Sequence, residues 1–227
     1  METGKKIVGI SPIQIETVEV TIKGKTPLIV HSWDEKAKRL MLETQTKGKV
    51  TAKRHAKIPT NDFMASLYWL TDKPAWGDTE EEAQENWAEA LKKGPSFGFP
   101  TTGIKKSVIS GAYRAGLDVK QTELRGTFYL YGVGGCSTDD FAEISFSEIE
   151  MREDMVRVGG QSKSADIRYR AQFPEWEIPL ALNYHKNGKY SLKQILNMFN
   201  YGGFCVGIGE WRPERNGQFG MYEIKTS

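Results

Sequence analysis

The sequence predicts an α+β fold in which helices cover one face of an antiparallel sheet. Three segments alternate polar and apolar side chains as half-buried strands do: residues 16–24, 143–152 and 219–225. Two others, residues 100–116 and 191–200, repeat apolar side chains at the spacing of an amphipathic helix. The chain of 227 residues is long enough for one such domain with a sizeable insertion.

The first strand is predicted at residues 16–24, where Val18, Val20 and Ile22 point to one face. The next clear strand is expected only near Leu124. So long an intervening segment exceeds a simple crossover, and it predicts an inserted subdomain.

This insertion is expected at residues 31–98, with short helices and a basic loop. A capping-box spacing predicts a helix that starts near Trp33. Residues 47–57 follow without a helical period and are interpreted as an exposed loop that orders on a ligand. Two further helices are expected at residues 61–70 and 77–90.

The helix of residues 100–116 is predicted to begin at a cap formed by Thr101 or Thr102. Lys105 and Lys106 then fall in its first turn, at the positive end of the helix dipole. Free N–H groups beside two lysines are typical of an anion-binding site. The alternative is a pair of solvated lysines without function.

Strands are predicted at residues 124–132 and 176–184, and Pro179 suggests that the second is an edge strand or carries a bulge. Ser191 is predicted to cap the last helix, and Gly202 to end it.

A glycine-rich loop is predicted at residues 202–220, before the last strand. Arg212 and Arg215 supply positive charge there, and Trp211 supplies a ring for stacking. The alternative is a loop packed on itself by Trp211 and Pro213. The glycines expected to let a ligand backbone approach are Gly207, Gly209 and Gly217.

Charge is segregated along the chain although the formal net charge is only +2. Residues 36–57 contain eight Lys or Arg and one acid, and residues 152–170 contain five bases and three acids. Residues 77–90 contain six acids and no base. The pattern favours one basic surface, or else solvated helices of opposite sign.

Several enzyme classes lack their motifs in this sequence: there is no phosphate-binding loop, no His-Glu-x-x-His and no Gly-x-Ser-x-Gly. The histidines, His31, His55 and His185, lack metal-ligand spacing. His31 is the one candidate for acid–base chemistry, and a capping or half-buried role is the alternative. We expect no catalytic residue, no metal and no cofactor.

The compartment is expected to be the cytoplasm, of a host cell if the protein is encoded by a phage. Cys136 and Cys205 form no disulfide framework, no apolar run is long enough to span a bilayer, and the first ten residues have no signal-peptide core.

Three segments together resemble the RAMP superfamily, the RNA-binding proteins of CRISPR effector complexes. Residues 206–220, VGIGEWRPERNGQFG, are similar to its glycine-rich signature loop. Residues 99–114, FPTTGIKKSVISGAYR, and 151–184, which include ADIRYR, resemble segments of the backbone subunits that polymerise along guide RNA. The sequence also resembles an uncharacterised protein family of tailed bacteriophages.

The resemblance implies a modified ferredoxin-like (RRM-like) core with thumb-like insertions. It implies that a nucleic-acid backbone runs over the glycine-rich loop and the helix of Lys105, and that copies associate into a filament or ring. In a phage, single-stranded DNA is as suitable a ligand as RNA.

The sequence therefore predicts a non-enzymatic protein that binds single-stranded nucleic acid, DNA or RNA, and oligomerises along it. One alternative is a phage protein that mimics a CRISPR effector subunit and binds a host or phage protein, and a second is a metal-independent ribonuclease using His31. No membrane partner is expected. The predicted ligand-binding side chains are Lys47, Lys49, Lys53, Arg54, Lys57, Lys105, Lys106, Arg114, Arg152, Arg157, Lys163, Arg168, Arg170, Trp211, Arg212 and Arg215.

Overall fold

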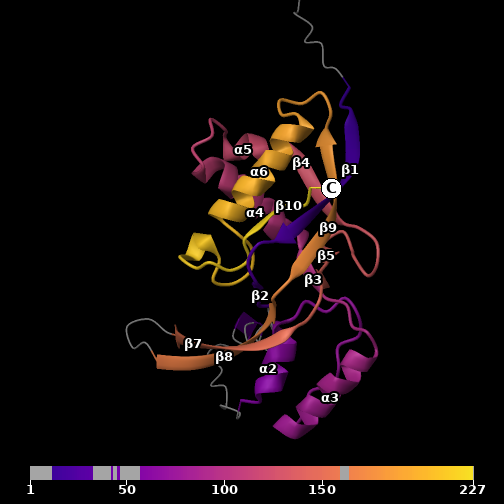
Figure 1. Cartoon of the computed structure of the whole chain (residues 1–227), viewed down its shortest axis with the longest axis vertical. Helices are drawn as coiled ribbons and strands as arrows, with labels where there is room; N and C mark the ends of the chain where they lie inside the picture. Colours follow the sequence, from indigo (N-terminus) through magenta and orange to yellow (C-terminus); the bar gives the residue numbers. More distant parts are fainter. Residues whose placement is uncertain (1–11, 33–41, 43–44, 47–56, 159–163, 227) are drawn as a thin grey trace, which may run out of the picture.

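The computed structural model describes residues 12–32, 42, 45–46, 57–158 and 164–226. The helix predicted near Trp33 lies outside these residues. So do several of the predicted ligand-binding side chains: Lys47, Lys49, Lys53, Arg54 and Lys163. The described part of the chain forms an upper layer of sheet and helices and a lower layer that carries a projecting hairpin (Figure 1).

The main sheet has the strand order β10-β1-β9-β4, and every neighbouring pair is antiparallel. Its strands are β1 Ile15–Gly24, β4 Phe128–Gly132, β9 Trp176–His185 and β10 Tyr222–Ile224, and the short β6 Ser145–Phe146 also pairs with β9. Every second residue of β9 is buried, beginning at Trp176. Strand β9 therefore has one face in the core and one face toward the other side of the sheet.

Helices α4 (Thr101–Arg114), α5 (Gln121–Leu124) and α6 (Leu192–Cys205) lie together on one face of this sheet (Figure 1). Ser191 caps α6, as the sequence predicts, and the Gln194 side chain caps it reciprocally. The predicted α+β fold, an antiparallel sheet with helices on one face, is confirmed.

The lower layer contains a three-stranded sheet in the order β2-β8-β7. Its elements are β2 Leu28–Val30, α2 Pro59–Ser66, α3 Glu80–Lys92, β7 Glu150–Val158 and β8 Ser164–Phe173, and β3 Gly98–Pro100 pairs with β5 Phe141–Glu143 nearby. This layer draws on residues 150–173 as well as on residues within the predicted insertion, 31–98.

Aromatic rings join the two layers. Phe146 of the main sheet and Phe173 of the lower sheet meet edge to face, with their ring centroids 5.1 Å apart. Phe97 lies 5.8 Å from Phe146 and 6.2 Å from Phe173, and Trp69 lies 4.9 Å from Phe97. Such aromatic pairs bury large apolar areas and fix their mutual geometry, so they hold the lower layer to the main sheet.

Glycines allow α6 to lie directly against α4 and β10. A Cβ atom on Gly111 would come within 2.4 Å of the Cα atom of Gly202, and one on Gly203 within 1.8 Å of the Tyr222 carbonyl oxygen. The prediction that Gly202 ends the helix is therefore wrong, because α6 continues to Cys205 and uses its glycines as packing surfaces. The predicted glycine-rich loop begins only after them.

The predicted cap of α4 is also wrong. Pro100 occupies the N-cap position, and no side chain caps the helix. The Thr101 hydroxyl instead donates to the backbone oxygen of Asp140 at 3.2 Å, so it ties the start of α4 to the segment before β5.

Pro179 lies in the middle of the main sheet, not in an edge strand, because β9 has β1 on one side and both β6 and β4 on the other. Strand β6 pairs with β9 up to Glu177, and β4 pairs from Leu180 onward. The proline lies between these two partners, in a gap that suits a residue without an N–H group.

The glycine packing of α6 predicts a stability effect. Gly203→Ala should lower the free energy of unfolding by about 1–3 kcal/mol, because the new methyl group has no room against the Tyr222 carbonyl. Gly126→Ala is the control, since no atom lies within 4 Å of a Cβ at that position, and it should change stability by less than about 0.5 kcal/mol. Equal urea midpoints for the two variants would contradict this packing.

Candidate nucleic-acid interface

The segment after α6, residues 206–220, is called here the glycine-rich loop, and it folds back onto β2. The Glu210 amide donates to the Ile29 carbonyl at 2.8 Å, and the Gly220 amide donates to the Pro27 carbonyl, also at 2.8 Å. Gly209 has φ 75°, and a Cβ there would come within 2.3 Å of the Ile29 oxygen. Only glycine combines this backbone conformation with so close an approach.

The same loop also closes on itself. Trp211 has φ 51°, and its carbonyl accepts from the Phe219 amide at 3.1 Å. A Cβ on Gly217 would lie 1.7 Å from that carbonyl oxygen, and Gly207 has φ 67°. The three glycines predicted to admit a ligand backbone are therefore required first by contacts within this chain.

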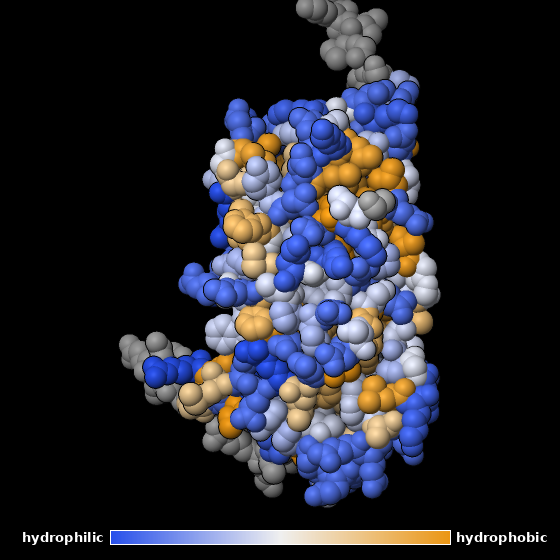
Figure 2. Space-filling model, viewed as in Figure 1, coloured by the Kyte–Doolittle hydropathy of each residue, from blue (hydrophilic) through white to orange (hydrophobic). Residues whose placement is uncertain are grey.

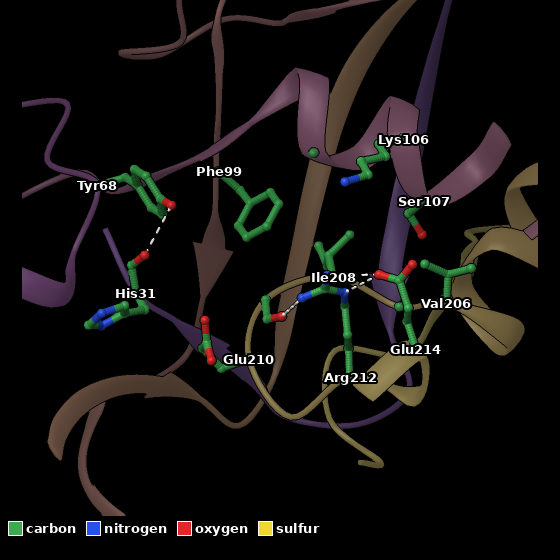
Figure 3. A pocket seen from close by; sticks show the side chains of 13 residues that line it. His31, Tyr68, Phe99, Lys106, Ser107, Val206, Ile208, Glu210, Arg212 and Glu214 are labelled. Atoms are coloured by element: carbon green, nitrogen blue, oxygen red, sulfur yellow. Dashed lines mark hydrogen bonds and ion pairs between the residues drawn. The ribbon is translucent and has the colours of Figure 1, made fainter. Parts of the chain in front are cut away.

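A pocket of about 190 Å³ lies between the glycine-rich loop, α4 and the end of β2. Lys106 enters it from α4, and Arg212 and Glu214 enter it from the loop (Figure 3). Its other side carries the rings of Tyr68 and Phe99 together with His31 and Glu210 (Figure 3). The pocket thus has a cationic end and an aromatic end.

Two arginines donate hydrogen bonds to the carboxylate of Glu214, and the charge of Lys106 also acts on it. Arg212 donates to its Oε2 atom through Nη2 at 2.8 Å and through Nε at 3.1 Å. Arg114 donates to Oε1 at 2.9 Å from the end of α4. Burial alone would raise the pKa of Glu214, but hydrogen bonding to Arg212 and the charges of Arg212, Arg114 and Lys106 outweigh it and leave this pKa below its ordinary value.

The sequence predicts that Lys105 and Lys106 of α4 form one anion site, but the structure separates them. Because α4 begins at Thr101, both lysines lie beyond its first turn. Their side chains also make different contacts. Lys106 lines the pocket. Lys105 donates to the Arg125 carbonyl at 2.8 Å and lies 4.0 Å from the centroid of the Tyr129 ring. Burial lowers the pKa of Lys105.

At the aromatic end of the pocket, the Tyr68 hydroxyl donates to the backbone carbonyl of His31 at 3.2 Å. Burial, and then the nearby negative charge of Glu210, raises the pKa of Tyr68. Its phenol therefore stays neutral at physiological pH and serves as a hydrogen-bond donor.

Asp154 of β7 joins the glycine-rich loop to the lower sheet. Its carboxylate accepts from Arg170 at 3.2 Å, from Arg152 at 2.9 Å and from the Trp211 indole at 3.3 Å. Arg170, whose side chain is only 3% exposed, also lies 3.8 Å from Glu210. These predicted ligand-binding residues are thus engaged with a buried carboxylate.

The remaining predicted ligand-binding side chains that the structure describes neither line the pocket nor contact Asp154. Arg157 is exposed on β7, and Arg168 is half-buried on β8. Lys57 pairs with Asp166 at 2.7 Å, and Arg215 is exposed in the short helix η1, Pro213–Arg215. Figure 2 shows hydrophilic surface at the described end of the β7–β8 hairpin.

Sequence reasoning missed Tyr68, Phe99, Glu210, Glu214 and Asp154. Glu214 lies between two predicted residues in the run Arg-Pro-Glu-Arg, so its place beside arginines was a readable signal. Glu210 directly precedes the predicted residues Trp211 and Arg212, so it too was readable. Tyr68 and Phe99 come from segments distant in sequence, and only the tertiary fold brings them to the pocket. Asp154 reaches the loop through its contact with the Trp211 indole.

A second surface lies on the opposite face of the main sheet from the helices. Tyr129 and Tyr131 of β4 and Asn183 of β9 line a shallow pocket there, together with Ile13 and Ile15. No Lys or Arg is among its described lining residues, and Lys105 lies 4.0 Å from the centroid of the Tyr129 ring. A phosphate backbone would therefore meet less positive charge here than at the pocket lined by Lys106 and Arg212.

No protein-family model matches the chain, and no curated protein matches it either. The solved structures similar to it include the crystal structure of Cmr6 from Pyrococcus furiosus. That similarity has a TM-score of 0.37 at 11% sequence identity, over 94% of this chain and 100% of Cmr6. Similarity of this degree carries no functional argument, so the site is judged on its own side chains.

Two further findings concern the described residues. They contain no group of three or more His, Cys, Asp or Glu side chains arranged to hold a metal ion. Within the same ranges, every helix is too short or too polar to span a membrane.

The Asp154 contacts predict that one buried carboxylate positions the glycine-rich loop. Asp154→Asn should lower the free energy of unfolding by about 3 kcal/mol, because it removes the nearer of the two carboxylates beside the buried Arg170 guanidinium and leaves only Glu210, 3.8 Å away. Amides of residues 206–220 should exchange hydrogen faster in this variant. Glu153→Gln, an exposed neighbour on β7, is the control, and unchanged exchange in Asp154→Asn would contradict the role of Asp154.

Proposed function

We propose that this chain binds single-stranded nucleic acid, without catalysing a reaction, in the groove between the glycine-rich loop and α4. One observation carries the proposal: Lys106, Arg114 and Arg212 converge there from two elements far apart in sequence. Side chains that converge on one open pocket from separate elements are typical of a binding site.

The chemistry of the groove suits a single strand. Phosphates interact with the cations of α4 and the loop, and this interaction is independent of base sequence. Bases stack on exposed rings, and Trp211, which is 40% exposed, lies between the pocket-lining residues Glu210 and Arg212 in the chain. Tyr68 offers a second ring at the aromatic end.

We further propose that the core is ferredoxin-like and of the RAMP kind. Apart from the short helix α5 and the short strand β6, the helices and strands of the upper layer follow one another as β1, α4, β4, β9, α6 and β10, which is the β-α-β-β-α-β order of that fold. The sheet order β10-β1-β9-β4 supports the same topology. In a phage, such a protein would act in DNA replication or recombination, or in RNA binding.

Replacing Lys106 tests the groove directly. Lys106→Ala should weaken binding of a labelled 20-nucleotide oligo-dT or oligo-U, and should reduce the salt dependence of log K by roughly 0.7, which is the contribution of one phosphate contact. Lys92→Ala removes the same charge from the exposed surface of α3 and should leave the slope unchanged. Equal slopes for both variants would remove Lys106 from the interface.

The same samples, run on a denaturing gel, test the absence of catalysis. The oligonucleotides should remain intact without added metal. His31 lines the pocket, so cleavage of oligo-U that disappears in His31→Ala would favour the ribonuclease alternative.

We also propose that copies associate along a strand. The β7–β8 hairpin exposes Met151, Met155 and Ile167, and Met155 is 79% exposed. A second copy would bury this surface. In mass photometry, the mass of the complex should increase stepwise as the oligonucleotide lengthens. A complex that holds one copy on strands of every length would contradict association.

A further inference from the structure

The Glu214 carboxylate occupies the centre of the cationic end of the pocket. It accepts hydrogen bonds from Arg212 and Arg114, and the charge of Lys106 also acts on it. Its side chain is 17% exposed, whereas that of Arg114 is 48% exposed. The carboxylate of Glu214 therefore lies where a ligand phosphate would have to bind.

Arg212 shows why this placement matters. Its Nε and Nη2 atoms donate to Glu214, and its Nη1 atom donates to the Gly209 carbonyl at 2.8 Å. All three nitrogens of the guanidinium are thus engaged within the chain. A phosphate gains the bidentate contact that arginine offers only if the Glu214 carboxylate moves away.

We propose that Glu214 is a built-in counter-anion, which a phosphate group of the bound strand displaces from Arg212 and Arg114. The inference rests on the proposed function for the identity of that ligand. The lowered pKa of Glu214 keeps the carboxylate ionised at neutral pH, so every bound strand competes with it. Glu214 thereby limits the affinity of the site and favours ligands that present several phosphates at once.

The displacement requires little movement of the backbone. Glu214 lies in the three-residue helix η1, whose Arg215 and following Asn216 are exposed. A change in the side-chain torsions of Glu214 is enough to move its carboxylate away from the arginines, since three rotatable bonds separate the carboxylate from the backbone.

Glu214→Gln tests the proposal, because the amide keeps the shape of the side chain and removes its charge. At neutral pH and 0.1 M salt, the variant should bind a labelled 20-nucleotide oligo-dT or oligo-U about tenfold more tightly than the wild type, since the local charge no longer opposes the phosphate. Inorganic tripolyphosphate should likewise raise the melting temperature of the variant more than that of the wild type.

Glu223→Gln is the matched control. Glu223 is an exposed glutamate that pairs with Lys25 at 3.0 Å. The adjacent Tyr222 is buried at the glycines of α6, so Glu223 points to the opposite face of the sheet. Glu223→Gln removes the same net charge as Glu214→Gln, and the affinity of Glu223→Gln for the oligonucleotides should stay within about twofold of the wild type.

The outcomes separate this inference from the proposed function. If oligonucleotides bind, but Glu214→Gln binds them no better than Glu223→Gln, the counter-anion role is wrong and the binding function stands. If only tripolyphosphate binds, and binds the variant more tightly, the groove is an anion site and nucleic-acid binding is wrong. If neither probe binds folded protein, both proposals fail.

A second variant covers the case in which Glu214→Gln does not fold, as judged by circular dichroism. Glu214→Asp keeps the charge but shortens the side chain by one methylene, so it no longer reaches Arg212 and Arg114 together. Its affinity for the oligonucleotides should lie between that of the wild type and about tenfold above it. An affinity below that of the wild type would contradict the proposal.

Discussion

The buried carboxylate of Asp154 is the contact on which the candidate site depends. Arg152 and Arg170 from the β7–β8 hairpin and Trp211 from the glycine-rich loop all donate to it. A buried charge is costly unless it is paired and hydrogen-bonded, so this carboxylate and its arginines hold one another in place. The loop is thereby fixed against the lower layer. Its Arg212 then meets Arg114 of α4 at the carboxylate of Glu214, and its Trp211 indole is held at Asp154.

The second constraint is the close contact between α4 and α6. Without side chains at Gly111 and Gly202 the two helices touch through their backbones, and Gly203 brings α6 onto β10. The Ser107 hydroxyl of α4 donates to the Gly202 carbonyl at 3.1 Å and accepts from the Tyr222 hydroxyl at the same distance. Helix α6 therefore ends beside α4, and the loop that follows it has to cross close to Lys106. The close packing of α4 against α6 therefore also positions the candidate site.

Local patterns predicted much of this fold, and the reasons for the failures are physical. Alternation along β1 and the capped, amphipathic α6 were readable, because side-chain periodicity determines which face is buried. The end of α6 could not be predicted from the sequence, because a glycine that terminates a helix and one that packs against a neighbouring helix are identical in sequence. Lys105 and Lys106 are adjacent in sequence, yet successive residues of a helix point about 100° apart. They therefore serve different contacts. The pairing of Glu214 with Arg114 joins residues that only the tertiary structure brings together.

Photo-crosslinking tests the central claim that the strand lies in the groove between α4 and the glycine-rich loop. An oligonucleotide with 5-iodouracil or 4-thiouracil at each position in turn would be irradiated in complex with the protein, and the crosslinked residues identified by mass spectrometry. Crosslinks are expected at Tyr68, which lines the groove, and at Trp211, which is 40% exposed and lies between the lining residues Glu210 and Arg212 in the chain. Crosslinks confined to Tyr129 and Tyr131, on the opposite face of the sheet, would contradict it.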